Sequence, residues 1–295
     1  MHAYRRKNLA SRTFDLFNLG LMLLLSILFL YPFWNLLMLS MTAPAYVDQL
    51  GLRLWADGFN LLSYKQLFSS DIIYIAYGNT ILRTVLGAGL TVGVTMCAAY
   101  SLSRKDLPFR NAITLFILFT IFFSGGLIPT YLNIKSLGLL NSIWALILPT
   151  LANAWYIILG RNFLMGFPKE LEDSALIDGA NPVQVAFRII FPLSMPIIAV
   201  IALWSGVAHW NAWFDAMIYL REKNDFVLQL LVQKIFQQDK IDTTSTGTYI
   251  QITTEVTNQS VKAATIVAAM TPIVLVYPFL QKYFAKGVMI GSLKG

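Results

Sequence analysis

Six long hydrophobic segments alternate with shorter polar links along the chain. Each is close to the roughly 20 residues that an α-helix needs to cross the hydrocarbon core of a bilayer. Because lipid offers no hydrogen-bond partners, the backbone of such segments is expected to pair internally as helices. The segments cover residues 16–41, 72–102, 111–129, 142–160, 196–220 and 263–280. The pattern predicts an all-α polytopic membrane protein with six transmembrane helices, forming a single transmembrane domain over residues 1–295.

The composition agrees with a chain embedded in lipid. Hydrophobic residues make up 57% of the sequence and charged residues 13%, with a mean hydropathy of +0.62. These values lie outside the range of ordinary soluble domains. The first segment is too long for a signal peptide and no small-x-small cleavage site follows it, so we expect it to be retained. Cys97 is the single cysteine of the sequence, which excludes an internal disulfide.

The net charge of +7 is distributed as membrane topology requires. Lys and Arg gather in short links and at the ends, which the positive-inside rule assigns to the cytoplasm. These residues are Arg5, Arg6, Lys7, Arg12, Arg104, Lys105, Arg110, Arg161, Lys169, Arg188, Lys282, Lys286 and Lys294. Both termini and the link 161–195 are therefore predicted to be cytoplasmic, and residues 221–262 to form a long external loop. Because the basic charge follows the membrane, no nucleic-acid partner is expected.

The link 161–195 has the pattern of a helix, a turn and a second helix. Acidic residues just after Pro168 complement the dipole of a helix N-terminus. Gly179 suits the left-handed conformation that ends a helix. The Asn-Pro pair at 181–182 is typical of the start of a second helix, which is expected to stop before Pro192.

This link carries more apolar residues than a plain surface loop needs. They are Leu171, Ala175, Leu176, Ala180, Phe187 and Phe191. Apolar residues surrounded by charge indicate a docking surface for another protein. A surface hairpin folded back on the helix ends is the alternative.

A second candidate site lies in the fifth segment. It combines aromatic rings with amide, imidazole and carboxylate groups, a combination that sugar sites use. Its members are His209, Trp210, Asn211, Trp213 and Asp215. On one continuous helix, Asn211 and Asp215 share a face and His209 and Trp213 share the neighbouring one. A role along a substrate path is one interpretation, and helix packing with an interfacial aromatic belt is the other.

Three further residues of the second segment carry structural expectations. Arg83 lies about a third of the way along the segment and is expected to snorkel outward to the interface. Gly89 and Gly93 form a G-x-x-x-G step, which is expected to let another helix approach closely.

Residues 168–196, PKELEDSALIDGANPVQVAFRIIFPLSMP, resemble the EAA loop of ABC importer permeases. The family pattern is Glu-Ala-Ala, three residues, Gly, nine residues and Ile-x-Leu-Pro. Here Asp173-Ser174-Ala175, Gly179 and Ile189-x-Phe191-Pro192 keep that spacing, with Asp for Glu, Ser for Ala and Phe for Leu.

The wider chain is similar to carbohydrate-uptake permeases of the maltose-transporter type. The similarity is carried by AAYSLSR at 98–104, WN at 210–211 and FAKGVMIGSLKG at 284–295. It is nearest to the MalG-like chain, in the oligosaccharide and polysaccharide branch that includes alginate and pectin-fragment importers.

The resemblance implies a type I importer permease fold and a transport subunit rather than an enzyme. It implies an ATP-driven importer of oligosaccharides, including acidic ones, in the bacterial cytoplasmic (inner) membrane. The implied partners are a second homologous permease chain, two ATPase subunits, an extracellular or periplasmic sugar-binding protein and membrane lipid. The sequence has no G-x-x-x-x-G-K-[ST] phosphate loop. We therefore expect no cofactor, metal or catalytic residue in this chain, with ATP and Mg bound by the partner ATPase.

Carried onto this sequence, the resemblance assigns ATPase coupling to seven residues. They are Asp173, Ser174, Ala175, Leu176, Gly179, Phe187 and Pro192. Asp173 is expected to make an ion-pair or cap contact, Gly179 to form the turn, and the apolar members to form an exposed knob. In MalG-like chains the loop corresponding to 221–262 reaches the binding protein, whereas a solvated loop without contacts is the alternative.

Other functions stay open at this point. The chain could import another class of solute by the same mechanism. A secondary transporter needs ion-coupling acids or inverted repeats, and no internal repeat is recognisable. A membrane-embedded hydrolase needs a nucleophile beside a base, and neither His2 nor His209 has such a motif.

Overall fold

The structure is a computed structural model that describes residues 9–49, 52–237 and 256–292. Over these residues the regular secondary structure is helical and contains no strand, so the predicted all-α class is confirmed. The chain forms two compact units. Among the described residues, one unit comprises those up to 70 and from 256 to 269, and the other comprises 71–237 and 270–292.

Long apolar helices identify the chain as a membrane protein. In the described part, residues 11–40, 71–103 and 258–276 are each long and apolar enough to span a bilayer. Two bent helix pairs, 110–136 and 182–211, raise the number to five if each pair is one span. The first, second and last predicted segments are therefore confirmed as helices. Three to five spans are found in the described part of the chain, so the count of six stays a prediction.

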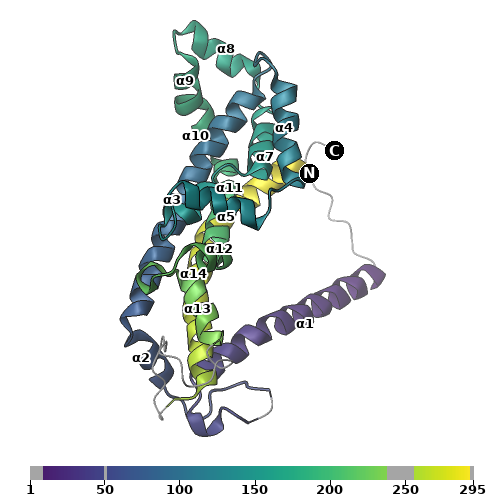
Figure 1. Cartoon of the computed structure of the whole chain (residues 1–295). Helices are drawn as coiled ribbons and strands as arrows, with labels where there is room; N and C mark the ends of the chain where they lie inside the picture. Colours follow the sequence, from purple (N-terminus) through teal and green to yellow (C-terminus); the bar gives the residue numbers. More distant parts are fainter. Residues whose placement is uncertain (1–8, 50–51, 238–255, 293–295) are drawn as a thin grey trace. The chain divides into compact units, whose positions relative to one another are not determined.

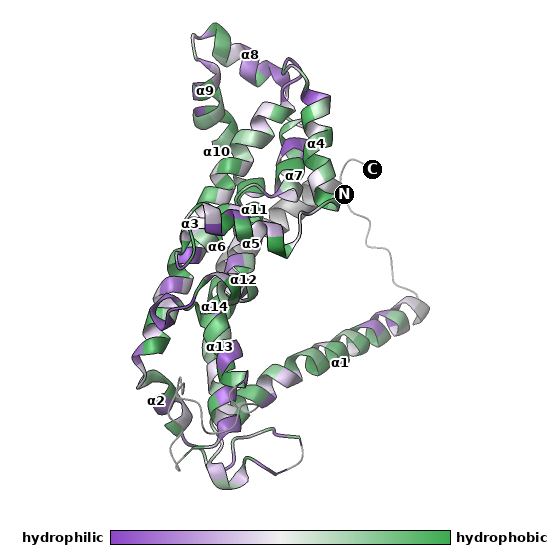
Figure 2. Cartoon of the chain, in the orientation of Figure 1, coloured by the Kyte–Doolittle hydropathy of each residue, from purple (hydrophilic) through white to green (hydrophobic). Residues whose placement is uncertain are grey.

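The first unit is built around α1 (Leu9–Ser40), which has Pro32 inside it. After α1 come η1 (Pro44–Tyr46) and α2 (Leu62–Phe68), and the unit also holds the start of α14 (Asn258–Ser292). A 2.7 Å hydrogen bond between the hydroxyls of Ser40 and Tyr64 ties the end of α1 to α2. The apolar window of α1 is not buried by the rest of the chain, and Figure 2 shows its predominantly hydrophobic surface.

The second unit is centred on α3 (Asp71–Ser103), against which α7 (Ala154–Leu164) and α11 (Met195–Asn211) pack (Figure 1). Small residues allow the close approach. A Cβ added at Gly160 would lie 3.0 Å from the Cβ of Ala99, and one at Gly87 would lie 2.4 Å from Nε2 of His209.

Gly89 and Gly93 were predicted to let another helix approach closely, and for helices of this chain that prediction was wrong. A Cβ at either glycine would meet nothing within 4 Å. The spacing identified a helix with small residues, but the glycine of α3 that lies against α11 is Gly87, on another face of the helix. Which face of a helix meets a neighbour depends on how the helices are arranged in space.

The third predicted segment is interrupted at a pair of glycines. Helix α4 (Arg110–Phe122) stops before the Ser-Gly-Gly stretch, and α5 (Leu127–Ser136) departs at 113°. Gly126 has a φ of +85°, a conformation that favours glycine.

The fourth predicted segment is not one helix, and this prediction was wrong. It holds α6 (Trp144–Ile147), a 3₁₀ turn η2 (Leu148–Thr150) and only the first part of α7. Proline 149 lies in the 3₁₀ turn, and Asn153 starts a new helix because its Oδ1 accepts the N–H of Tyr156 at 3.2 Å.

The fifth predicted segment is also divided. Helix α11 ends at Asn211, and α12 (Phe214–Tyr219) begins after a two-residue break. Next come η4 (Lys223–Asp225) and α13 (Leu228–Gln237), at the start of the predicted external loop. Residues 238–255 of that loop lie outside the described residues.

Candidate functional site

The link between α7 and α11 folds as a helical hairpin, here called the coupling hairpin, residues 168–194. Helix α8 (Lys169–Ile177) follows Pro168, and Gly179 has a φ of +86° in the turn. Asn181 and Gln184 cap α9 (Pro182–Val185) reciprocally, with N–H···O distances of 2.8 and 2.9 Å. The predicted helix, glycine turn and second helix are therefore confirmed.

The second arm of the hairpin does not stop before Pro192, as the sequence predicted. A π-helical turn, η3 (Ala186–Ile190), follows α9 and leads into α10 (Phe191–Leu193). The π turn changes the hydrogen-bond register, so Pro192 falls in the first turn of α10, where its missing N–H is tolerated. The arm then bends by 79° into α11 at the buried Ser194.

The inner face of the hairpin is part of the core of the second unit. Ala175, Val185 and Ile190 are buried in one cluster with residues of three other helices. Those residues are Met96 and Ala99 of α3, Leu164 of α7, and Ile197 and Ile201 of α11. The hairpin is thus packed on the ends of three helices, as Figure 1 shows, and is expected to move with them as one body.

An ion pair fastens the first arm of the hairpin to the end of α3. Arg104 forms a salt bridge with Glu172 and donates a 3.3 Å hydrogen bond to Asp106. Burial disfavours the charged form of Arg104, but these two acids outweigh it and raise the pKa of the guanidinium. The residues of this pair lie 68 positions apart. No local sequence pattern therefore indicated their contact.

The outer face of the hairpin is exposed and partly apolar. Ile177 is 87% exposed, Val183 65%, Phe187 57% and Leu176 38%. The carboxylate of Asp173, the hydroxyl of Ser174 and the ring of Pro192 belong to exposed residues as well. Figure 2 shows that hydrophilic residues predominate on α8. Apolar and polar residues are thus both exposed on the hairpin, and its role as a docking surface stays a prediction.

Ala175 does not belong to that outer face, and its assignment to an exposed knob was wrong. It is 8% exposed and packs in the inner cluster. Ile177 and Val183, which the sequence analysis did not select, are exposed instead. Alternation along a helix indicates that two faces exist, but only the position of α3 decides which face is covered.

The second candidate site is split by the break after α11. Asn211 is exposed at the end of α11, where its Nδ2 donates a 3.0 Å bond to the carbonyl of Val207. Asp215 belongs to the first turn of α12. The predicted shared face of Asn211 and Asp215 was therefore wrong, because no continuous helix joins them. His209 and Trp210 are buried, and Trp213 is half-buried with an edge-on ring contact to Phe214.

Arg83 does not snorkel to the membrane surface, so that prediction was wrong too. It is 1% exposed and forms an ion pair with Asp215, whose side chain is 26% exposed. Its Nη1 also donates a 3.1 Å hydrogen bond to the carbonyl of Ala212, in the break. The break supplies both a carbonyl without a helical partner and a nearby carboxylate, so Arg83 finds its partners inside the protein.

The start of the predicted external loop is held against α3. The amide of Asn79 donates to the carbonyls of Asn224 and Phe226 at 2.8 and 3.1 Å. The hydroxyl of Thr80 accepts the N–H of Leu228 at 2.7 Å. Helix α13 is largely buried, so this part of the loop is not the solvated segment that the sequence left as an alternative.

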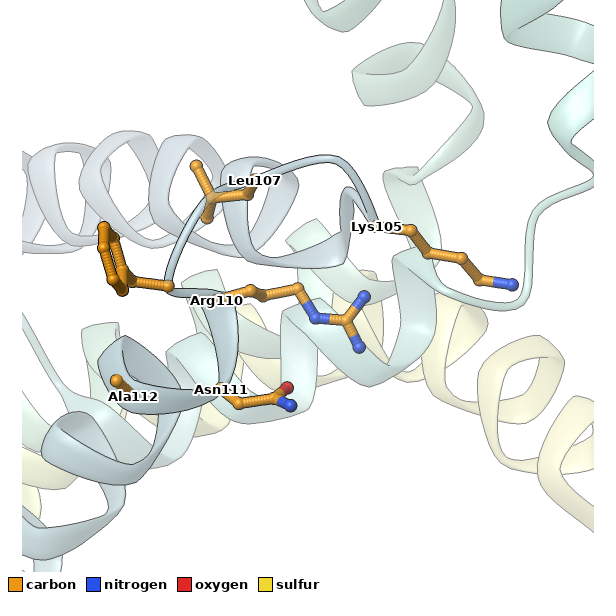
Figure 3. A pocket seen from close by; sticks show the side chains of 6 residues that line it. Lys105, Leu107, Arg110, Asn111 and Ala112 are labelled. Carbon is orange, nitrogen blue, oxygen red and sulfur yellow. The ribbon is translucent and has the colours of Figure 1, made fainter.

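An open hollow of about 590 Å³ lies in the link between α3 and α4. It is lined by Lys105, Leu107, Phe109, Arg110, Asn111 and Ala112. Figure 3 shows Lys105 and Arg110 extending in the same direction from this link. None of the predicted site residues lines it.

No protein-family model matches the chain. The chain is 38% identical over 290 residues to the polygalacturonan/rhamnogalacturonan transport system permease protein YtcP of Bacillus subtilis (strain 168), covering 97% of this chain and 99% of that protein. Its fold matches a chain of a bacterial ABC transporter involved in the import of the acidic polysaccharide alginate, with a TM-score of 0.85 and 28% identity. That match covers 94% of this chain and 99% of the other.

A second structural match concerns the fold alone. A chain of the bacterial alginate ABC transporter in complex with an alginate pentasaccharide-bound periplasmic protein gives a TM-score of 0.56 at 16% identity. The match covers 93% of this chain and 96% of the other.

Proposed function

This chain belongs to the family of ABC importer permeases for carbohydrate uptake, and we propose that it is the MalG-like permease of an importer for acidic oligosaccharides. It is a transport subunit and not an enzyme. The choice of acidic sugars is supported by two similar transporters, one described for polygalacturonan/rhamnogalacturonan and the other for alginate. Import of another solute class by the same machinery is the alternative.

The complete importer is proposed to contain this chain with a second, homologous permease chain and two ATPase subunits. The ATPase subunits bind ATP and Mg, whereas this chain holds no cofactor. A periplasmic or extracellular binding protein delivers the sugar. A binding protein is present in the complex of the second structural match.

The proposed topology has six spans in the bacterial inner membrane, with both termini in the cytoplasm. Its support is that the contacts of α3 agree with the predicted sides. The end of α3 touches the coupling hairpin, and both are predicted to be cytoplasmic. The start of α3 touches residues 224–228, and both are predicted to be external.

The coupling hairpin is the observation that carries the proposal. Its inner face is packed on α3, α7 and α11, while its outer face leaves Ile177, Val183 and Phe187 exposed. A partner that binds the outer face therefore moves three membrane helices through one rigid body. ATPase closure would act at this face, with Asp173 and Ser174 as polar contacts and Gly179 as the turn.

A substrate path at the break after α11 is a separate part of the proposal. Exposed Asn211, half-buried Trp213 and partly exposed Asp215 offer an amide, a ring and a carboxylate to a sugar. His209 and Trp210 are buried and are not proposed to contact the sugar.

The test is co-purification of the chain with its genetic neighbours, followed by reconstitution in lipid vesicles. The expected result is ATP hydrolysis stimulated by the loaded binding protein, with uronic oligosaccharides more effective than neutral ones. Stimulation by neutral sugars alone contradicts the acidic substrate. Uptake by the isolated chain, driven by an ion gradient, contradicts the whole proposal.

A paired variant tests the docking face. Ile177→Ser with Phe187→Ala is expected to weaken ATPase binding at least about tenfold, because burying each apolar side chain contributes about 1.5–3 kcal/mol. The control is Phe109→Ala, an 82% exposed aromatic residue in the link between α3 and α4. Equal loss in both variants contradicts docking at the hairpin.

A further inference from the structure

The segment after η1 exposes large apolar side chains. Trp55 is 77% exposed, Leu52 80% and Leu54 61%. An external loop in water normally covers such residues or replaces them with polar ones. Their position relative to α1, within the first unit, indicates what surrounds them.

Two hydrogen bonds fix this segment alongside α1. The indole Nε1 of Trp34 donates to the carbonyl of Leu54 at 3.0 Å. The backbone N–H of Arg53 donates to the hydroxyl of Tyr31 at 3.2 Å. Trp34 and Tyr31 precede Ser40, the last residue of α1, by six and nine residues, which corresponds to about 9 and 13 Å along the axis.

The chain on both sides of the segment lies at the end of α1. The N–H of Ala43 donates to the carbonyl of Asp57 at 2.9 Å, and that of Asn60 to the carbonyl of Met41 at 2.9 Å. Residues 52–55 therefore leave the level at which α1 ends, lie beside its last turns, and return. This short excursion runs back along α1, away from its C-terminal end.

Arg53 is the one charged residue among residues 52–55, and its guanidinium donates to backbone carbonyls. The Nη2 of Arg53 donates to the carbonyls of Tyr46 and Gln49 at 3.2 and 3.1 Å, and also to that of Val47. Its charge is thus solvated by carbonyl groups of residues 46–49. Leu52, Leu54 and Trp55 remain as the outward surface of the segment.

The depth of the excursion places this surface at the edge of the hydrocarbon. Counting roughly 20 residues from Leu16 for the hydrocarbon core brings its outer edge to about residue 35. Tyr31 and Trp34 then lie just inside that edge, in the zone where aromatic rings gather in membrane proteins. At this level Leu54 therefore contacts acyl chains or protein, and not bulk water.

We propose that residues 52–55 form a wedge inserted into the lipid leaflet in which α1 ends. The wedge is hydrogen-bonded to α1, whose apolar window is not buried by the chain. Trp55 supplies the ring typical of an interfacial anchor. This inference depends on the proposed topology only for the assignment of this leaflet as the outer one.

The test uses nitroxide labels on the assembled importer in lipid nanodiscs. Leu54→Cys is labelled in a Cys97→Ser background, and collision rates with oxygen and with a water-soluble nickel chelate are compared. Oxygen is expected to dominate at position 54, as it should at Phe29→Cys on exposed α1, whereas the chelate should dominate at Asp57→Cys. The ratio at position 54 should shift toward that of position 29.

Two results overturn the wedge. A ratio at position 54 that matches position 57 places the segment in water, and low collision rates with both reagents show that a protein partner covers it. A second measurement uses brominated lipids, which should quench less of the tryptophan fluorescence in Trp55→Phe than in the unchanged chain. Both measurements are independent of sugar uptake, so failed transport does not affect them.

Discussion

Arg83 carries a full positive charge in a helix long and apolar enough to cross a membrane. A charge at that depth is tolerated when it is paired and hydrogen-bonded inside the protein. Here Asp215 supplies the opposite charge, and the carbonyl of Ala212 accepts a further hydrogen bond. The pair thus stabilises the break between α11 and α12 and holds it against α3.

Removing one member of this ion pair should destabilise the protein far more than removing both members. Asp215→Ala leaves a buried unpaired charge and is expected to destabilise the protein by about 3–5 kcal/mol. Arg83→Met with Asp215→Leu removes both charges and should cost much less. Thermal unfolding of the purified complex measures both, with exposed Arg221→Ala as the surface control.

A double variant that is as unstable as the single one would contradict this account. In that case the hydrogen bond of Arg83 to the break, rather than the pairing of charges, would hold α12 in place.

Gly87 gives a second prediction at the scale of one residue. Gly87→Ala places a methyl group 2.4 Å from the imidazole of His209 and should cost about 1–3 kcal/mol through overpacking. Adding His209→Ala makes room and should restore part of the loss. Gly89→Ala, which meets nothing within 4 Å, is the matched control on the same helix. Equal unfolding temperatures for Gly87→Ala and Gly89→Ala would contradict the tight contact.

At the scale of elements, the coupling hairpin must meet two different requirements within residues 168–194. A glycine with positive φ and a reciprocal cap fix its shape locally. The inner cluster and the Arg104–Glu172 pair then fix it to the membrane helices. Transmission of movement depends on the second requirement, because a well-formed but loosely attached hairpin would rotate without moving α3.

Weakening that attachment should reduce coupling more than stability. Glu172→Gln removes the charge partner of Arg104 and should cost about 1 kcal/mol or less, as partly exposed pairs do. The expected result is fewer sugars imported per ATP hydrolysed in reconstituted vesicles. Glu170→Gln, on the same first turn of α8 but exposed, is the control and should leave this ratio unchanged. A lower ratio in both variants would assign the effect to the helix dipole instead.

At the scale of the whole molecule, the positions of charges and contacts give the chain a direction in the membrane. The proposed topology assigns the coupling hairpin to the side where ATP is available and residues 52–55 to the other side. Single cysteines in a Cys97→Ser background test this. Asp178→Cys should react with an impermeant maleimide after the cells are opened, and Asp57→Cys in intact cells. Reaction of position 178 in intact cells contradicts the topology.

Local patterns in the sequence were sufficient for much of this protein. The hydrophobic runs at 16–41, 72–102 and 263–280 predicted helices, because lipid forces a long apolar chain to satisfy its own backbone. The structure has helices at 9–40, 71–103 and 258–292. Gly179 and Asn181 predicted the hairpin, because left-handed turns and helix caps depend on residues within four positions. The spacing of the EAA-like motif identified the superfamily.

Contacts between distant residues were decided by the tertiary structure alone. The burial of Ala175, the pairing of Arg83 with Asp215 and that of Arg104 with Glu172 depend on which helices lie beside α3. Residues 83 and 215 were both noticed in the sequence, yet their partnership requires the chain to break at 212–213 and return to α3. Sequence periodicity specifies a helix and its faces, whereas the neighbour of each face is set by packing among elements far apart in the chain.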